Sequence, residues 1–425
     1  MTDTRQAPGG GVRELLRGGA GIAVAMGVMN VATYGFQMIA ARLLGPEAYG
    51  AIAGLMALLL VVAVLQLGLQ ATAARRISST PDHVAQIEDV ILGVTYRWAI
   101  GLGLVLLVAS PAVWTLLRLD SIVPAILLAV AAVPLTIMGG QAGILQGERR
   151  WFPLAGVYLA MGLPRLVVGT ICILISPTET SAMFGVMLGL FAPAALGWYA
   201  LRRGRESGDT SDDHERRPIV KETVRNSVAL LAFFVLSNAD IVIARNVLDG
   251  HDAGLYAGGL ILTKAVLFLP QFVVVVAFPS MAGAGDRRRA LTRSLGAVLA
   301  VGLVCTLASV VLSRVALVFV GGPQYAEVQS LLWVFSILGT LLAMLQLLVY
   351  SVVARQSSRS TYLIWGAVLV LVVASFRIST LHALLATVTA VDAVLFAVLL
   401  ALALWPRRPA GEDRTVAATA GVRQR

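Results

Sequence analysis

Charged residues are scarce in this chain of 425 residues. Asp, Glu, Lys and Arg together make up 13% of the sequence, whereas hydrophobic residues make up 58%. A soluble globular domain has about 25% charged and 45–50% apolar residues. So little charge excludes a protein whose surface faces water on all sides, and it indicates a protein of the membrane.

Cysteine and histidine are also rare, with two and four residues, and a nucleotide-binding motif is missing. Cys172 and Cys305 each lie inside an apolar run, which argues against a disulfide framework and favours two small packing residues. The four histidines are scattered without metal-ligand spacing, and no GxxxxGK[ST] phosphate-binding motif occurs. We therefore expect no enzyme, no cofactor and no metal site.

The net charge of +10 has a simple explanation in the distribution of the cations. A basic chain can bind nucleic acid, but here Lys and Arg are dispersed over many short segments between apolar runs. We therefore expect no nucleic-acid partner.

Runs of about 20 mostly apolar residues are long enough to cross a bilayer as helices. They predict an all-α integral membrane protein with about twelve spans, and the short turns near 177 and 379 leave eleven or thirteen open. The predicted spans are 21–43, 49–74, 90–114, 121–146, 152–176, 181–201, 224–248, 253–280, 294–320, 328–354, 360–378 and 381–405.

Lys and Arg concentrate on one side of these predicted spans. If both termini are cytoplasmic, 25 of the 33 Lys and Arg residues lie in cytoplasmic segments. Cytoplasmic loops of membrane proteins carry such an excess. The sequence therefore predicts a multi-pass protein of the bacterial plasma (inner) membrane with both termini in the cytoplasm.

A polar stretch near the middle divides the spans into two sets of six. The predicted segments are a cytoplasmic N-terminus at 1–20, a bundle at 21–201, a cytoplasmic linker at 202–223, a second bundle at 224–405 and a disordered cytoplasmic tail at 406–425. Four residue pairs recur at offsets of 203 to 207: Arg42/Arg245, Tyr49/Tyr256, Gln141/Gln346 and Arg150/Arg355. Six spans per set predict two parallel repeats with a substrate site between them.

Five charged residues fall inside the predicted spans: Arg97, Arg165, Asp240, Lys264 and Asp392. A charge at the centre of a spanning helix costs about 2.5–3.5 kcal/mol, so it usually faces a cavity or a partner. We assign the three cations to substrate binding, together with Arg42 and Arg245 at the outer ends of spans, and the two acids to ion coupling. A structural ion pair, or a long side chain that reaches the interface, is the alternative for each.

Uncharged polar residues form stripes on two of the spans. Asn30, Tyr34 and Gln37 follow the spacing of one helical face, and Gln66 and Gln70 are four residues apart. We predict that these five residues line the substrate site. Hydrogen bonding between packed helices is the alternative, because it uses the same residue types.

The charges inside the spans show a surplus of cations. None of the first six predicted spans contains an acidic residue. Arg binds phosphate oxygens through charge-assisted hydrogen bonds, so this balance favours an anionic cargo such as a phosphate or pyrophosphate head group.

Several segments resemble one family of membrane proteins. They are NVATYGFQMIAARLLGPEAYG at 30–50, GILQGERRWFPLA at 143–155, PRLVVG at 164–169 and SNADIVIARNVLDGHDAGLYAGGLILTKAVLFLP at 237–270. These segments are similar to the bacterial polysaccharide-biosynthesis flippases, the Wzx-like branch of the MOP superfamily, and the resemblance covers about residues 20–405.

The resemblance implies a V-shaped pair of six-helix bundles, whose cavity is lined largely by spans 1, 2, 7 and 8. It implies a flippase that moves polyprenyl-pyrophosphate-linked oligosaccharide or polysaccharide to the outer leaflet by alternating access, as in lipopolysaccharide or exopolysaccharide export. The expected partners are this lipid-linked glycan, membrane lipid, and a polysaccharide polymerase or glycosyltransferases.

Two other functions stay open. One is a MATE-like antiporter for cations or drugs, although such antiporters usually rely on acidic residues in the first bundle. The other is a membrane scaffold for polysaccharide assembly that transports nothing, which would leave Arg165 and Lys264 unexplained.

Overall fold

The computed structural model describes residues 19–79, 84–202, 216–281, 287–353 and 358–404, and within these ranges the chain is helical with no strand. The helices are α2 (Gly19–Ser79), α3 (Val84–Leu116), α4 (Val123–Gly147), α5 (Trp151–Ile175), α6 (Glu179–Arg202), α7 (Arg216–Val247), α8 (Gly250–Met281), α9 (Arg287–Val311), α10 (Ser313–Val320), the 3-10 helix η2 (Pro323–Leu331), α11 (Leu332–Val353), α12 (Ser358–Ser375) and α13 (Leu381–Leu404). Nine stretches within the described ranges are long and apolar enough to cross a membrane. The prediction of an all-α, multi-pass membrane protein is confirmed.

Helix α2 contains the first two predicted spans as two arms that meet at a sharp turn. Gly45 adopts φ 77° and ψ 171° at this turn, and Pro46 follows it. A positive φ is readily accessible to glycine because it has no Cβ, and proline favours the start of a new helical segment. The turn therefore folds the second arm back beside the first.

One predicted span in the second half of the chain is divided in the structure. The predicted span 294–320 is interrupted at Leu312, which has φ −105° and ψ 36° and separates α9 from α10. Helix α6 ends at Arg202 and α7 begins at Arg216, so the end of the predicted linker 202–223 is helical, and the predicted division into segments stays a prediction. The predicted tail at 406–425 lies outside the described residues, as does nearly all of the predicted N-terminus.

The expectation that the first six spans contain no acidic residue is also wrong at two helix ends. Helix α3 begins six residues before the predicted span and includes Glu88 and Asp89, and α6 begins at Glu179. Glu88 and Glu179 are both buried. Apolar runs mark the centre of a span, whereas the polar first turn of a helix gives no such signal.

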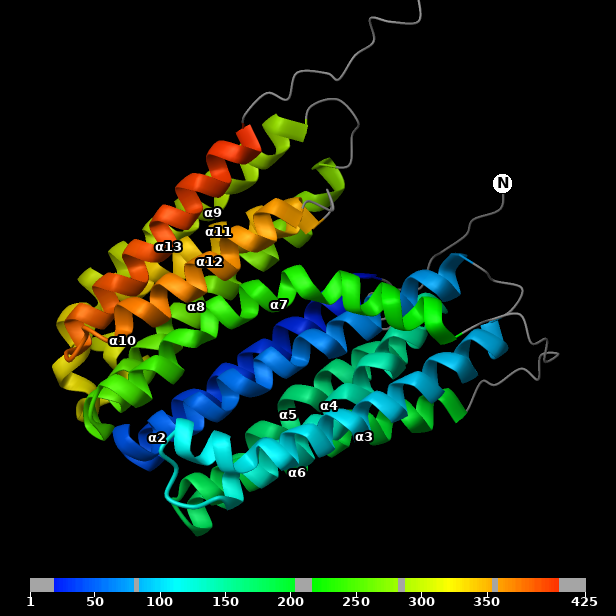
Figure 1. Cartoon of the computed structure of the whole chain (residues 1–425), viewed down its shortest axis with the longest axis horizontal. Helices are drawn as coiled ribbons and strands as arrows, with labels where there is room; N and C mark the ends of the chain where they lie inside the picture. Colours follow the sequence, from blue (N-terminus) through cyan, green and yellow to red (C-terminus); the bar gives the residue numbers. More distant parts are fainter. Residues whose placement is uncertain (1–18, 80–83, 203–215, 282–286, 354–357, 405–425) are drawn as a thin grey trace, which may run out of the picture.

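The helices form two groups, α2–α6 and α7–α13 (Figure 1). Helix α2 packs against α7 and α8 and thereby connects the groups. The ribbons converge near α10 and the turn of α2, and they diverge toward the other end (Figure 1). We call the convergent end the joined end; it holds the turn at Gly45, the loop 117–122, the α7–α8 turn and η2.

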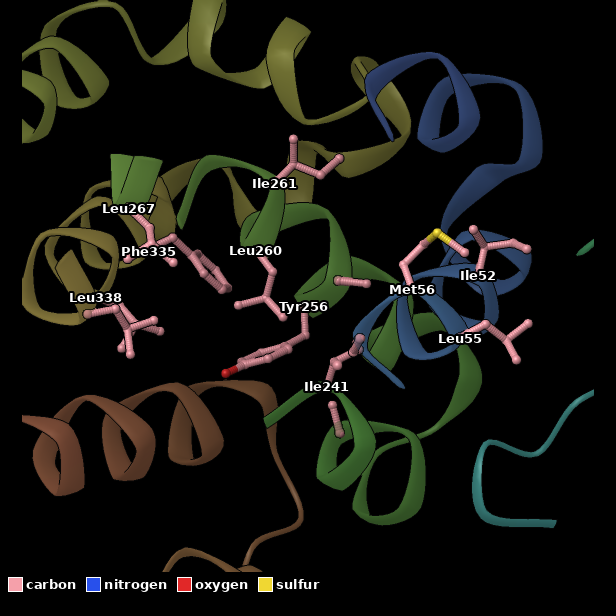
Figure 2. Close-up of a cluster of buried hydrophobic side chains, with 14 of the residues drawn as sticks. Ile52, Leu55, Met56, Ile241, Tyr256, Leu260, Ile261, Leu267, Phe335 and Leu338 are labelled. Carbon is pink, nitrogen blue, oxygen red and sulfur yellow. The ribbon is translucent and has the colours of Figure 1, made fainter. Parts of the chain in front are cut away.

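An apolar core continues across the boundary between the groups. Figure 2 shows Ile52, Leu55 and Met56 of α2 near Ile241 of α7 and near buried side chains of α8 and α11. Tyr256 and Phe335 form an edge-on pair at the centre of this cluster, with ring centroids 5.4 Å apart. Burial of this apolar surface holds α2 of the first group against α7 and α8 of the second.

Within the first group, glycines allow helices to approach closely. A Cβ added at Gly185 would lie 2.5 Å from the Cα atom of Gly169, and a Cβ at Gly189 would lie 2.7 Å from the Cα atom of Arg165. Small residues at such spacing are typical of tightly packed membrane helices. Helix α6 therefore lies directly against the backbone of α5 at Arg165.

Candidate functional site

A small cavity lies between the two groups of helices, where α2, α7 and α8 meet. Its volume is about 40 Å³, which holds only a few water molecules. It is lined by Phe36, Gln37, Tyr49, Ile52, Ala53, Met56, Ala57, Leu60, Asn238, Ile241, Ala257, Leu260, Ile261 and Lys264. Gln37, Asn238 and Lys264 supply most of its polar groups in a mainly apolar wall.

Tyr34 crosses the boundary beside this cavity. Its hydroxyl donates a hydrogen bond of 3.1 Å to the backbone oxygen of Lys264. Its ring lies against Phe268, with centroids 6.0 Å apart. One residue of the first group thus touches two positions of α8 in the second group.

Arg165 is buried in the first group, with 8% of its surface exposed. Helix α6 packs against the backbone of Arg165 at Gly189, and the Arg165 side chain reaches α2, where its Nη2 donates to the hydroxyl of Thr33. Its Nε has no acceptor among the described residues. Tyr34 is its electrostatic neighbour, and no carboxylate of the described chain forms an ion pair with it.

Lys264 has acidic neighbours, in contrast to Arg165. Its ammonium donates to the backbone oxygen of Ser237 and interacts electrostatically with Asp240 of α7 and Asp392 of α13. Both carboxylates are 2% exposed. The second group therefore contains two buried acids that interact electrostatically with one cation, and that cation also lines the cavity.

The glutamines of the second arm of α2 face the interior of the first group. Gln70 donates hydrogen bonds to Gln146 Oε1 (3.0 Å) and to the hydroxyl of Tyr158 (2.8 Å). Gln66 packs against α4 at Gly139. For Gln66 and Gln70 the structure favours the alternative reading, hydrogen bonding and packing between helices.

Three more predicted site residues do not line the cavity. Arg97 is exposed on the surface of α3, and Arg42 is exposed at the joined end. Asn30 is half-buried on the first arm of α2. Of the predicted substrate-binding residues, Gln37 and Lys264 line the cavity. Tyr34 binds the backbone of Lys264 beside it, and Arg165 interacts electrostatically with Tyr34.

Arg245 is buried at the joined end, and backbone oxygens of the first group surround its guanidinium. Nε donates to Leu117 O (2.8 Å), Nη2 to Arg118 O (2.7 Å) and Nη1 to Glu47 O (3.5 Å). All three nitrogens are therefore used by carbonyls of the opposite group. In this conformation Arg245 closes the joined end and does not face the cavity.

Other side chains at the joined end bind helix ends across the boundary in the same way. Arg118 donates to Asn246 O (2.7 Å) and Leu248 O (3.4 Å), and Asn246 Nδ2 donates to Leu116 O (2.7 Å). Gln324 of η2 donates to the backbone oxygens of Ala41 and Arg42, each at 2.9 Å. The last carbonyls of a helix lack partners within the helix. Each group therefore caps helix ends of the other, and we call these bonds the cross-caps.

Sequence reasoning overlooked several residues of this region. Asn238 lines the cavity beside the predicted Asp240, and a polar residue in an apolar run was the available signal. Asn246 and Gln324 bind backbone oxygens, for which the sequence holds no signal. Glu179 is buried and accepts a hydrogen bond of 2.8 Å from the backbone nitrogen of Asp120 near Arg245.

Comparison with known proteins gives one family and one fold. The family model described as "Polysaccharide biosynthesis protein" matches residues 15–284. No curated protein matches the chain.

Solved structures match over nearly the full length at low sequence identity. An inward-facing multidrug resistance MATE family transporter of the MOP superfamily has a TM-score of 0.70 and 14% identity, with 89% of this chain and 93% of that chain covered. A MOP superfamily transporter from Pyrococcus furiosus has a TM-score of 0.63 and 16% identity, covering 94% and 98%. An outward-facing MATE transporter has a TM-score of 0.62 and 16% identity, covering 94% and 97%. The fold is that of MOP superfamily transporters.

Proposed function

Because the chain belongs to the polysaccharide biosynthesis protein family and has the fold of a membrane transporter, we propose that it carries a polyprenyl-pyrophosphate-linked oligosaccharide or polysaccharide across the plasma membrane. Transport proceeds by alternating access between the groups α2–α6 and α7–α13. The protein sits in the bacterial inner membrane with both termini in the cytoplasm, and a polysaccharide polymerase or glycosyltransferases are its partners.

The observation that carries this proposal is the environment of Arg165. A buried guanidinium with an unpaired Nε and no carboxylate in contact is costly in a membrane protein, unless a ligand supplies the missing charge. Tyr34 lies between Arg165 and Lys264, since it interacts with the first and donates to the backbone of the second. A pyrophosphate group that reaches both cations would compensate their charge.

The size of the cavity requires a change of conformation for such a cargo. About 40 Å³ is far below the roughly 300–1,000 Å³ of ligand pockets. The cross-caps hold the joined end closed, while the helices diverge toward the other end (Figure 1). With the proposed topology, the joined end faces away from the cytoplasm, and the cargo binds when the two groups move apart around Tyr34.

Transport by reconstituted protein tests the proposed function. We expect Arg165→Ala and Lys264→Ala each to lower the rate at which a lipid-linked glycan reaches the opposite leaflet by about tenfold to a hundredfold, because each removes charge-assisted bonds of about 1.5–3 kcal/mol. Arg97→Ala is the matched control, since Arg97 is exposed on α3. Wild-type rates in both test variants would contradict the site, and no glycan transfer by the wild-type protein would contradict the function.

Asp240 and Asp392 are proposed to couple transport to a proton or sodium gradient. This role is supported by the deep burial of both carboxylates. Lys264 is the one cation among the described residues that interacts electrostatically with both of them. We expect Asp240→Asn or Asp392→Asn to make the transport rate insensitive to an imposed gradient. Transport by both variants that still follows the gradient as in the wild type would exclude this role.

A MATE-like antiporter for cations or drugs is the second candidate. The same two carboxylates favour it, because a buried acid can bind a cation as well as couple an ion. Export of a cationic dye by the same proteoliposomes distinguishes the candidates. Dye export without glycan transfer would replace the flippase proposal with the antiporter.

A further inference from the structure

Lys264 lies between two sets of possible partners. On the side of the second group, its ammonium binds the backbone oxygen of Ser237 and interacts with Asp240 and Asp392. On the other side, Lys264 is part of the wall of the cavity between the groups. A lysine side chain is long and flexible, so a movement of its ammonium between the two sides needs no change of the backbone.

The two carboxylates depend on Lys264 to different degrees. Asp240 Oδ1 accepts a hydrogen bond from the backbone nitrogen of Ile241 (2.9 Å), and Oδ2 accepts one from the hydroxyl of Tyr256 (3.2 Å). Asp392 has no hydrogen-bond donor among the described residues. Its electrostatic balance therefore comes from Lys264, with Asp240 as a neighbour of like charge.

Few other titratable groups face this cluster. Tyr34 of α2 and Tyr256 of α8 contact it, and Arg165 acts on Tyr34. Helix α11 packs against α8 and α13 but carries no charged residue over 332–349. If Lys264 leaves the acids, nothing else in the described surroundings can replace its positive charge.

We propose that Lys264 is a shared cation, which the pair Asp240/Asp392 holds in the empty protein and an anionic cargo group in the cavity draws away. The inference rests on the proposed function, because it takes the pyrophosphate of that cargo as the anion. Once Lys264 binds the anion, the acid pair lacks one positive charge and takes up one cation from solution. Binding of the anion and uptake of a cation are thus coupled through one side chain, and by linkage each favours the other.

Calorimetry with the purified full-length protein tests the shared cation, with a short-chain polyprenyl pyrophosphate as the probe. Titrations in buffers of different ionisation enthalpy measure the protons taken up per probe bound, and a series of sodium concentrations measures sodium linkage. The wild type is expected to take up about one proton per probe, or to bind the probe more tightly as sodium rises. These two outcomes identify the cation.

Three variants separate this coupling from general damage to the site. Asp392→Asn removes a competitor for Lys264, so we expect it to bind the probe at least about fivefold more tightly and with reduced cation uptake. Lys264→Met is expected to bind more weakly and without cation uptake. Asp249→Asn changes an exposed carboxylate and should behave as the wild type.

Tighter binding is a result that misfolding of a variant does not produce. Probe binding by the wild type with neither proton nor sodium linkage would overturn the shared cation and leave the transport proposal standing. The same holds for an Asp392→Asn protein that binds no more tightly than the wild type. If the wild type fails to bind the probe, the proposed function falls and this inference falls with it. The linkage of the wild type decides the question even if no variant folds.

Discussion

Replacement of Arg245 by alanine is expected to open the joined end of the molecule. Arg245 donates to three backbone oxygens, of Leu117, Arg118 and Glu47, from a buried position. Hydrogen bonds to a charged group contribute about 1.5–3 kcal/mol each. When the joined end opens, water binds the freed carbonyl oxygens, and these new hydrogen bonds offset part of the loss. We therefore expect a net shift on the order of 3 kcal/mol, which is roughly a hundredfold in the ratio of open to closed molecules.

Distances between spin labels measure this shift. Leu43 and Leu312 belong to opposite groups near the joined end, and 37% and 53% of their surfaces are exposed, so cysteines at these positions accept labels once Cys172 and Cys305 are replaced by serine. Arg245→Ala should populate a longer distance between the labels. Arg314→Ala is the matched control, because Arg314 is an exposed arginine close to Leu312. An unchanged distance distribution in Arg245→Ala would show that the cross-caps do not hold this end closed.

The second large effect is expected from a single methyl group at Gly254. A Cβ at this position would lie 2.0 Å from the backbone oxygen of Pro46, across the boundary between α8 and the turn of α2. A backbone atom cannot move aside as the end of a side chain can, and overpacking costs about 1–3 kcal/mol or more. Gly254→Ala should therefore separate the two groups at the joined end. If the groups stay together, the clash should lower the stability of the folded protein.

A loss of stability in Gly254→Ala can be attributed to the clash, because the helix propensity of alanine would by itself raise the stability. Gly→Ala inside a helix contributes about 1 kcal/mol of stability by propensity alone. Gly101→Ala, in α3, adds its methyl group to open space and should gain this stability without a cost. For Gly254→Ala we expect a longer Leu43–Leu312 label distance or a lower melting temperature in detergent. A protein that matches Gly101→Ala in both measurements would contradict the close contact.

Much of the fold could be predicted, because a helix that crosses a bilayer needs about 20 consecutive, mostly apolar residues. Apolar runs of about 20 residues identify the helices, and the Gly45–Pro46 pair marks the turn between the first two spans. The break at Leu312 lies in the stretch ASVVLSRVA at 308–316, where neither glycine nor proline gives a signal and only the polar pair Ser313–Arg314 follows it. The sequence therefore reads as one apolar span over 294–320, although the helix is divided there.

The site was predictable only in part, for a related reason. Periodicity places Tyr34 and Gln37 on one face of the first arm, and the structure places that face at the boundary between the groups. Periodicity does not tell which helices Gln70 faces. In the structure it donates hydrogen bonds to side chains of α4 and α5. Arg245 binds main-chain oxygens, which every sequence supplies, so its partners leave no pattern in the sequence.

Arg165 and Lys264 lie on opposite sides of the boundary that the hydrogen bond from Tyr34 to the backbone of Lys264 crosses. Under the proposed alternating access, the distance between these two cations changes as the groups move against each other. A short, doubly charged head group that bridges both cations would then lose affinity during this motion, so the motion itself would favour release on the far side.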